Sequence, residues 1–192
     1  MNWISKIKQK PNDLKMTPPT LAKKCISLIN IEDDDVILDG FKGTGNFFNN
    51  YPTNCKKDYC EIEEGLDFFK YDKEYDWFIT NPAFSLITPT LNKVCKEAKK
   101  GFGLLIGVLN LTPKRLAIIH DAGYNITKIH YSIIRGWLGT AVFIVAERDK
   151  PSIVTYDVKN YPPEGEEGKN FLLKYNKYQK EYRAKRLAML NN

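Results

Sequence analysis

The stretch VILDGFKGTGNF, residues 36–47, combines a short β-rich run, a glycine-punctuated loop and the start of a helix. The run ends in an acid, Asp39, and we expect the helix over about residues 45–51. Gly43 and Gly45 let the backbone approach a ligand closely and take positive φ at no steric cost. A helix that follows such a loop presents unpaired N–H groups to whatever the loop holds. The stretch therefore predicts a strand-loop-helix unit that binds a small molecule.

A second acid lies where a nucleotide-binding unit needs one. Residues 57–62 read as the next strand, and Glu61 stands near its end. In nucleotide-binding α/β units, an acid about 20 residues past the glycine loop accepts hydrogen bonds from ribose hydroxyls. Glu63 and Glu64 are rivals, but Glu61 lies closest to the apolar strand. Glu61 is therefore the predicted ribose ligand.

The segment Asn81-Pro82-Ala83-Phe84 follows the apolar run of residues 75–80 and should open onto a cleft where a buried strand ends. Its amide side chain and its proline carbonyl offer two hydrogen-bond acceptors, and its phenyl ring offers a stacking surface. These groups suit a planar molecule with an exocyclic amine, such as adenine. Asn-Pro is also a common turn signal after a strand, so the segment gains its meaning from the glycine loop upstream.

Apolar periodicity indicates the remaining elements. The expected helices cover residues 20–29, with Thr17 as cap, and 86–99, and another starts at Thr112-Pro113. The expected strands are 36–40, 57–62, 66–69, 75–81, 101–109, 126–134 and 141–147, with 152–156 as a candidate edge strand. Strands that alternate with helices imply an α/β fold whose mostly parallel sheet has helices on both faces.

Composition excludes several classes of protein. The 192 residues are 43% hydrophobic and 27% charged, which is ordinary for a globular domain. No apolar run approaches the roughly 20 residues that a membrane span needs, and no signal-peptide core is visible, so we expect a cytoplasmic protein. The four cysteines lack CxxC spacing and only two histidines accompany them, which predicts reduced, buried thiols and no metal site.

Charge is concentrated at the two ends of the chain. Residues 1–24 and 169–192 together carry +11, whereas the whole chain carries +6, so the centre carries −5. Basic ends on a mildly acidic body suit a polyanionic substrate bound with salt-dependent affinity. The alternative is that lysine-rich ends only aid solubility.

In their order, these motifs resemble the class I S-adenosylmethionine-dependent methyltransferases, and among them the DNA adenine-N6 methyltransferases, especially compact phage and viral ones. The resemblance covers about residues 11–148. Residues 16–22 resemble the segment before the family's first strand, 39–45 its D-P-F-A-G-S/T-G loop, and 81–84 its [N/D]-P-P-[Y/F] signature. The resemblance implies a Rossmann-like sheet with an antiparallel last strand, S-adenosyl-L-methionine as cofactor, and the cytoplasm of a bacterial or virus-infected host cell.

The resemblance also implies roles for the matching residues. Those expected to hold the methionyl end of the cofactor, its ribose and its adenine ring are Thr17, Pro18, Asp39, Phe41, Gly43, Gly45, Glu61, Asp67 and Phe68. The residues expected to act on the substrate amine are Asn81, Pro82 and Phe84.

Three positions depart from the family pattern. Gly40 and Lys42 stand where the family usually has proline and alanine, and Ala83 replaces the second proline of the signature. Loss of a proline that pre-sets φ costs about 0.4–1 kcal/mol, or roughly two- to fivefold in rate. Ala83 therefore indicates a slower or looser site. Lys42 points either to solvent or toward the methionyl carboxylate.

Two further regions are candidates for nucleic-acid binding. Arg135 and Trp137 lie in the loop of the last expected hairpin, where an aromatic ring beside an arginine can stack on a displaced base, although tryptophan is more often a core residue. After a domain of residues 1–160 and a linker of 161–168, residues 169–192 predict a basic amphipathic helix. Its expected nucleic-acid contacts are Lys174, Lys177 and Arg183.

These patterns predict transfer of a methyl group to the N6 amine of adenine in nucleic acid, with DNA expected ahead of RNA. The alternatives are an RNA adenine or protein-glutamine methyltransferase, because both substrates present a planar nitrogen, and a catalytically silent cofactor-binding subunit. A homodimer or a separate recognition subunit would supply sequence recognition.

Overall fold

The computed structural model describes residues 16–135, 137, 139–158 and 165–190. The chain divides into two compact units, one ending at Asp157 and one beginning at Val158. The helices, 3-10 helices (η) and strands are α1 (Pro19–Ile26), β1 (Val36–Asp39), η3 (Phe48–Asn50), β2 (Lys56–Tyr59), η4 (Ile62–Glu64), η5 (Phe68–Lys70), β3 (Trp77–Thr80), η6 (Phe84–Leu86), α2 (Ile87–Glu97), β4 (Gly101–Gly107), η7 (Val108–Asn110), α3 (Pro113–Asp121), β5 (Tyr124–Ser132), β6 (Ala141–Arg148) and α4 (Gly165–Leu190).

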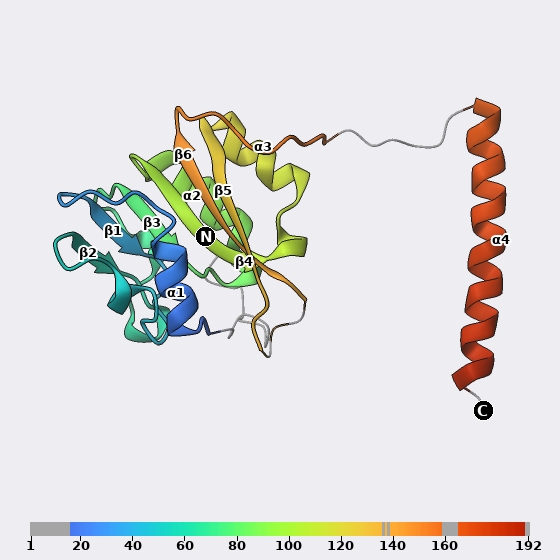
Figure 1. Cartoon of the computed structure of the whole chain (residues 1–192), viewed down its shortest axis with the longest axis horizontal. Coiled ribbons are helices and arrows are strands. Elements are labelled where there is room, and N and C mark those ends of the chain that lie inside the picture. The colour runs from blue at the N-terminus through green and yellow to red at the C-terminus, as the bar shows by residue number, and fades with distance from the viewer. Residues whose placement is uncertain (1–15, 136, 138, 159–164, 191–192) are drawn as a thin grey trace. The chain divides into compact units, whose positions relative to one another are not determined.

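The first unit is built on a six-stranded sheet in the order β2-β1-β3-β4-β6-β5. Strands β2, β1, β3 and β4 pair in parallel, whereas β6 runs antiparallel to both β4 and β5. This is the α/β, mostly parallel sheet with an antiparallel last strand that the sequence predicts. Helix α1 lies on one face of the sheet and α2 on the other (Figure 1).

Alternating side chains of the central strands build a core on each face of the sheet. On one face, Leu38 and Phe78 pack with Leu91 of α2 and Leu116 of α3. On the other face, residues such as Ile79 pack with helix α1 and with Phe47 and Phe143. Apolar side chains therefore cover both faces, which explains the nearly continuous apolar runs of β3 and β4.

Two local predictions are wrong for identifiable reasons. The helix expected over residues 45–51 is only the short 3-10 helix η3, because Gly45 before it has a left-handed φ of 80° and Pro52 after it holds Tyr51 in an extended conformation with ψ of 151°. The strand expected over 66–69 is replaced by η5, because the Asp67 carboxylate accepts a hydrogen bond from the Phe69 N–H and caps a helical turn.

Two smaller expectations are also corrected. Pro18, not Thr17, is the N-cap residue of α1, and no side chain caps that helix. Residues 152–156 form no strand, although the Ile153 N–H donates to the Ile126 carbonyl at 2.9 Å.

The four cysteines are buried free thiols, as predicted. No helix among the described residues is long and apolar enough to cross a membrane.

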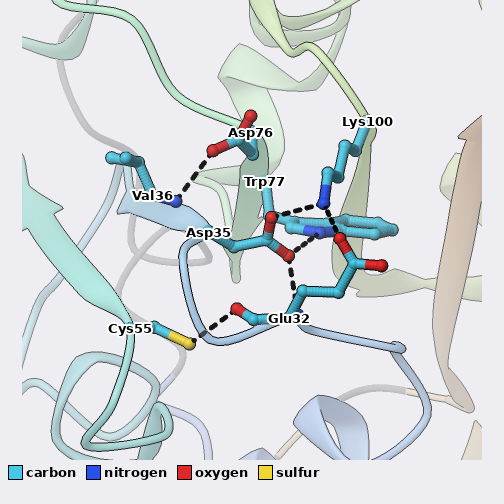
Figure 2. A network of polar contacts seen from close by, with 7 residues as sticks. All are labelled: Glu32, Asp35, Val36, Cys55, Asp76, Trp77 and Lys100. Atoms are coloured by element: carbon cyan, nitrogen blue, oxygen red, sulfur yellow. Dashed lines mark hydrogen bonds and ion pairs between the residues drawn. The ribbon is translucent and has the colours of Figure 1, made fainter.

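A polar network ties together the amino ends of β1, β3 and β4 (Figure 2). Asp35, only 2% exposed, accepts hydrogen bonds from the Trp77 indole N–H at 3.0 Å and from the Glu32 backbone N–H at 2.8 Å. The Lys100 ammonium lies 2.6 Å from the other Asp35 oxygen and also pairs with the Glu32 side chain. This buried carboxylate is therefore well compensated, and it fixes the strands at the edge opposite their carboxyl ends.

The second unit contains helix α4, which begins at Gly165, four residues before the expected start. Its described apolar side chains are largely exposed, among them Leu173, Tyr178 and Tyr182. The rings of Tyr178 and Tyr182 stack with centroids 6.2 Å apart.

Candidate functional site

The carboxyl ends of β1 and β3 meet at a buried hydrogen bond. Asp39 ends β1 and Thr80 ends β3, and the two strands are neighbours in the sheet. The Thr80 hydroxyl donates to Asp39 Oδ1 at 2.6 Å, and both residues are at most 1% exposed. This bond joins the glycine loop after β1 to the Asn81–Phe84 segment after β3. Ligands of open α/β sheets bind at this edge.

Asp39 is electrostatically unusual. Its Oδ2 atom is buried and accepts no hydrogen bond of standard geometry from the described residues. Burial raises the pKa of Asp39 to about 7, against the lowering effect of the Thr80 hydrogen bond. A buried polar atom with an unused acceptor site is costly, so Asp39 Oδ2 is a candidate acceptor for a ligand donor.

The glycine loop is hydrogen-bonded to two other segments of the chain that are predicted to hold the cofactor. Gly43 has φ of 50° and Gly45 has φ of 80°, values that favour glycine. The Gly43 N–H donates to the Glu61 carboxylate at 2.6 Å, and the Asn46 side chain donates to the Thr17 carbonyl at 2.8 Å. The structure therefore brings Thr17, the loop and Glu61 together, as the predicted cofactor site requires.

The hydroxyl of Thr17, which can both donate and accept a hydrogen bond, is a second buried polar group at this edge of the sheet. Its hydroxyl is buried and makes no hydrogen bond with any described residue. Pro18, the next residue, begins the turn into α1 as its N-cap. The buried hydroxyl of Thr17 thus has unused hydrogen-bonding capacity next to the loop.

Lys42 does not point freely into solvent, which was one of the two positions considered for it, because its side chain is only 18% exposed. Its ammonium lies 3.7 Å from the centroid of the Tyr59 ring and 2.5 Å from a Glu64 oxygen. The Tyr59 hydroxyl donates to the other Glu64 oxygen at 2.9 Å. The hydrogen bond to Glu64 raises the pKa of Lys42. Lys42 therefore fastens the loop to β2 and to the turn that begins at Glu61.

The structure explains why glycine occupies position 40. A Cβ atom there would lie 2.3 Å from Phe78 Cε2 and 3.1 Å from Phe68 Cδ2. The Phe78 ring fills this space and packs against Phe68 with centroids 4.8 Å apart. The Phe78 ring therefore fills the space that a side chain at position 40 would need.

Of the two residues predicted to face the adenine ring, Phe68 lies inside this aromatic cluster and Asp67 precedes it. Phe68 is only 3% exposed and contacts Phe41, whose half-buried ring lies with its centroid 5.6 Å away. The Asp67 carboxylate accepts the Phe69 N–H at 3.0 Å. Phe41 is thus the more accessible of the two rings, and Phe68 supports it from the core.

The Asn81–Phe84 segment meets the β5–β6 hairpin loop. Asn81 is half-buried, Pro82 is buried, and Phe84 begins η6 with a half-buried ring. Trp137, expected to be exposed, is also half-buried, because the Phe84 ring packs against it edge-to-face with centroids 5.4 Å apart. Arg135 is exposed, as expected. The hairpin loop therefore supports the segment predicted to receive the substrate amine.

The remaining predicted nucleic-acid contacts belong to the second unit. Lys174, Lys177 and Arg183 are exposed on α4.

Comparison with known proteins was informative at the level of structure. No protein-family model matches the sequence, and no curated protein does. A protein of Pyrococcus horikoshii described as an RNA methyltransferase matches with a TM-score of 0.59 and 18% identity, over 80% of this chain and 95% of its own. A methyltransferase of Pyrococcus furiosus matches with a TM-score of 0.55 and 13% identity, over 74% of this chain and 88% of its own. This chain has the class I methyltransferase fold.

A third structure with this fold contains a ligand. Magnesium protoporphyrin IX methyltransferase of Synechocystis, with S-adenosylmethionine bound, matches with a TM-score of 0.52 and 12% identity, over 68% of this chain and 77% of its own.

Within the methyltransferase fold, some contributors were not predicted from the sequence. Thr80 holds Asp39, Asn46 holds Thr17, and the Tyr51 hydroxyl donates to the Ile79 carbonyl beside Thr80. A threonine at the end of the otherwise apolar β3 run was a usable signal, because a buried polar side chain needs a partner. The contacts of Asn46 and Tyr51 depend on tertiary structure and leave no local pattern.

Proposed function

We propose that this protein transfers a methyl group from S-adenosyl-L-methionine to the exocyclic N6 amine of adenine in nucleic acid, with DNA as the expected substrate. The observation that carries the proposal is the Thr80–Asp39 hydrogen bond of 2.6 Å. It joins the glycine loop and the Asn81–Phe84 segment at the ends of adjacent strands. A methyl donor held by the first would therefore lie beside an amine held by the second.

The side chains at this edge are chemically suited to the cofactor. Asp39 Oδ2 and the Thr17 hydroxyl are buried polar atoms that make no hydrogen bond of standard geometry with the described residues, so both could bind the cofactor's ammonium and carboxylate end. Glu61 accepts the Gly43 N–H through Oε2 and the Glu63 N–H through Oε1, and each oxygen retains a lone pair for ribose hydroxyls. Phe41, with Asp67 and Phe68 behind it, would border the adenine ring. When bound, this cofactor supplies an electrophilic methyl group on a sulfonium.

The protein's own work on the substrate is orientation. An adenine amine is a weak nucleophile, because its lone pair is delocalised into the ring. The Asn81 side-chain oxygen and the Pro82 carbonyl would accept its two N–H groups, which favours rehybridisation and offsets the developing positive charge. Phe84, supported by Trp137, would stack on the base and fix the direction of the amine.

Charge supports nucleic acid over a protein substrate. The two ends of the chain carry +11 together, and Arg135 is exposed in the hairpin loop whose Trp137 contacts Phe84. RNA is the second candidate substrate, favoured by the similarity to a protein described as an RNA methyltransferase. A methyl-transfer assay would also identify the two alternatives, which are transfer to protein glutamine and cofactor binding without transfer.

The test is transfer of tritiated methyl from S-adenosyl-L-methionine to DNA, RNA and protein acceptors, with product nucleosides identified by mass spectrometry. Asn81→Ala should lower kcat by at least about 100-fold, the effect of removing one preorganised polar contact to developing charge. Its cofactor affinity should stay measurable by calorimetry. Asn92→Ala, an exposed asparagine on α2, is the matched control. Full transfer by the Asn81 variant would refute the assignment.

A further inference from the structure

The connection between β4 and α3 presents a leucine almost entirely to solvent. Leu109, the middle residue of η7, is 91% exposed. Single exposed leucines are common on protein surfaces, so the exposure of Leu109 alone indicates no function. The contacts of the turn that holds Leu109 are what indicate one.

The turn that presents Leu109 is braced from several sides. Arg115 Nη1 donates to the Asn110 backbone carbonyl at 2.8 Å and to Asn110 Oδ1 at 3.0 Å, and Arg115 Nε donates to the Thr88 hydroxyl at 3.0 Å. The Val108 N–H donates to the Thr140 carbonyl at 2.9 Å. These hydrogen bonds fix the conformation of the turn. Leu109 therefore stays exposed, whereas a residue in a loosely held loop could fold inward.

This turn borders the proposed substrate segment. A Cβ atom at Gly107 would lie 3.3 Å from Asn110 Nδ2 and 3.8 Å from Phe84 Cε2. The side chain of Asn110 and the ring of Phe84 thus both lie close to Gly107. Leu109 therefore belongs to the turn that lies against the ring proposed to stack on the target base.

The flank of the turn is complementary to a phosphate backbone. The first turn of α3 holds Lys114 and Arg115 and contains no acid. Arg115 makes no ion pair with any residue in the described part of the chain. Cations at a helix N-terminus oppose the helix dipole, and an anionic strand alongside would relieve that opposition.

We propose that Leu109 inserts into the base stack of duplex DNA and fills the space vacated by the target adenine. The inference rests on the proposed function, because a base inside a duplex must leave the stack before its amine can reach Asn81 and Phe84. Apolar wedges such as leucine stabilise unstacked base steps in other settings. Arg115 acts as a positioning residue, because its hydrogen bonds to Asn110 hold the turn that carries Leu109.

The experiment compares methyl transfer to one random-sequence DNA pool supplied as duplex and as single strands, with N6-methyl-2′-deoxyadenosine counted by mass spectrometry. Leu109→Ala should lower kcat/KM on the duplex by about tenfold or more, corresponding to about 1.4 kcal/mol, and change it less than about twofold on single strands. Ile153→Ala, which truncates another exposed aliphatic side chain at 62% exposure, should leave both values unchanged. Thermal unfolding and cofactor affinity of the Leu109 variant should match those of the unmodified chain.

Equal losses on both substrates, no loss on either, or activity of the unmodified chain on single strands alone would each overturn the wedge and leave the proposed function intact. Absence of adenine methylation by the unmodified chain on every DNA and RNA substrate would overturn both.

Discussion

Replacing Gly40 with alanine should destabilise the first unit, although glycine-to-alanine substitutions often stabilise proteins. The new Cβ atom would lie 2.3 and 2.5 Å from two atoms of the Phe78 ring. Carbon atoms in contact prefer about 3.5–4.0 Å, so the ring or the backbone must move by more than about 1 Å. Phe78 is fully buried and packs against Phe68, which leaves it nowhere to move without strain.

Overpacking of this kind costs about 1–3 kcal/mol. For a chain of this size, each kcal/mol shifts the Tm by about 2–4 °C, so Gly40→Ala should lower the Tm by about 2 to 12 °C. Circular dichroism during heating and urea unfolding both measure the effect. Gly107→Ala is the control, because its Cβ would lie 3.3 Å from Asn110 Nδ2 and 3.8 Å from Phe84 Cε2, distances that a small shift accommodates, and it should cost less than about 1 kcal/mol.

A double variant tests the cause. Phe78→Leu removes the ring atoms that Gly40→Ala would strike, so the alanine should be less costly in that background. Unchanged stability of Gly40→Ala, or an equal cost with and without the Phe78 ring, would refute the reasoning. The result also bears on the candidate site, because Gly40 separates Asp39 from Phe41, and glycine at this position would then be explained by packing.

The remaining predictions concern three carboxylates. Glu61→Ala should weaken cofactor binding in calorimetry and deprive the Gly43 N–H of its acceptor; an unchanged Kd would move the ribose contact elsewhere. Because burial raises the pKa of Asp39 to about 7, the folded protein holds a proton there that the unfolded chain releases near pH 4, and stability is lost as pH rises from about 4 to about 7. Asp39→Asn should remove that loss, and parallel stability-pH curves for both proteins would contradict it. Lys100→Met, which removes the ion pair of buried Asp35, should cost about 1–3 kcal/mol in urea unfolding, whereas Lys99→Met, which breaks only an exposed pair, should cost about 0–1 kcal/mol; equal costs would count against the network.

The sequence predicted the sheet well, because its strands are short apolar runs between polar or glycine-rich segments. It failed where a single residue decided a local conformation. Pro52 shortened the helix after the glycine loop, and Asp67 converted an expected strand into a capped turn. Both residues were visible in the sequence, but apolar periodicity takes no account of them.

The candidate site was predictable in its parts and only partly in its contacts. The acids, glycines and the Asn81–Phe84 segment could be recognised by type and order. The partners of Lys42, the ring that fills the space at Gly40 and the contact of Trp137 with Phe84 join residues far apart in the chain. Such contacts depend on how the loops pack, which spacing in the sequence does not encode.

The positions of two tryptophans give the protein a pair of intrinsic optical reporters. Trp77 is buried with its indole N–H bonded to Asp35, so its emission should shift to the red only when the amino edge of the sheet unfolds. Trp137 lies half-buried against Phe84, so its emission should respond to occupancy of the opposite edge. With Trp3 replaced by phenylalanine, ligand titration and denaturation could be followed in one cuvette without any added label.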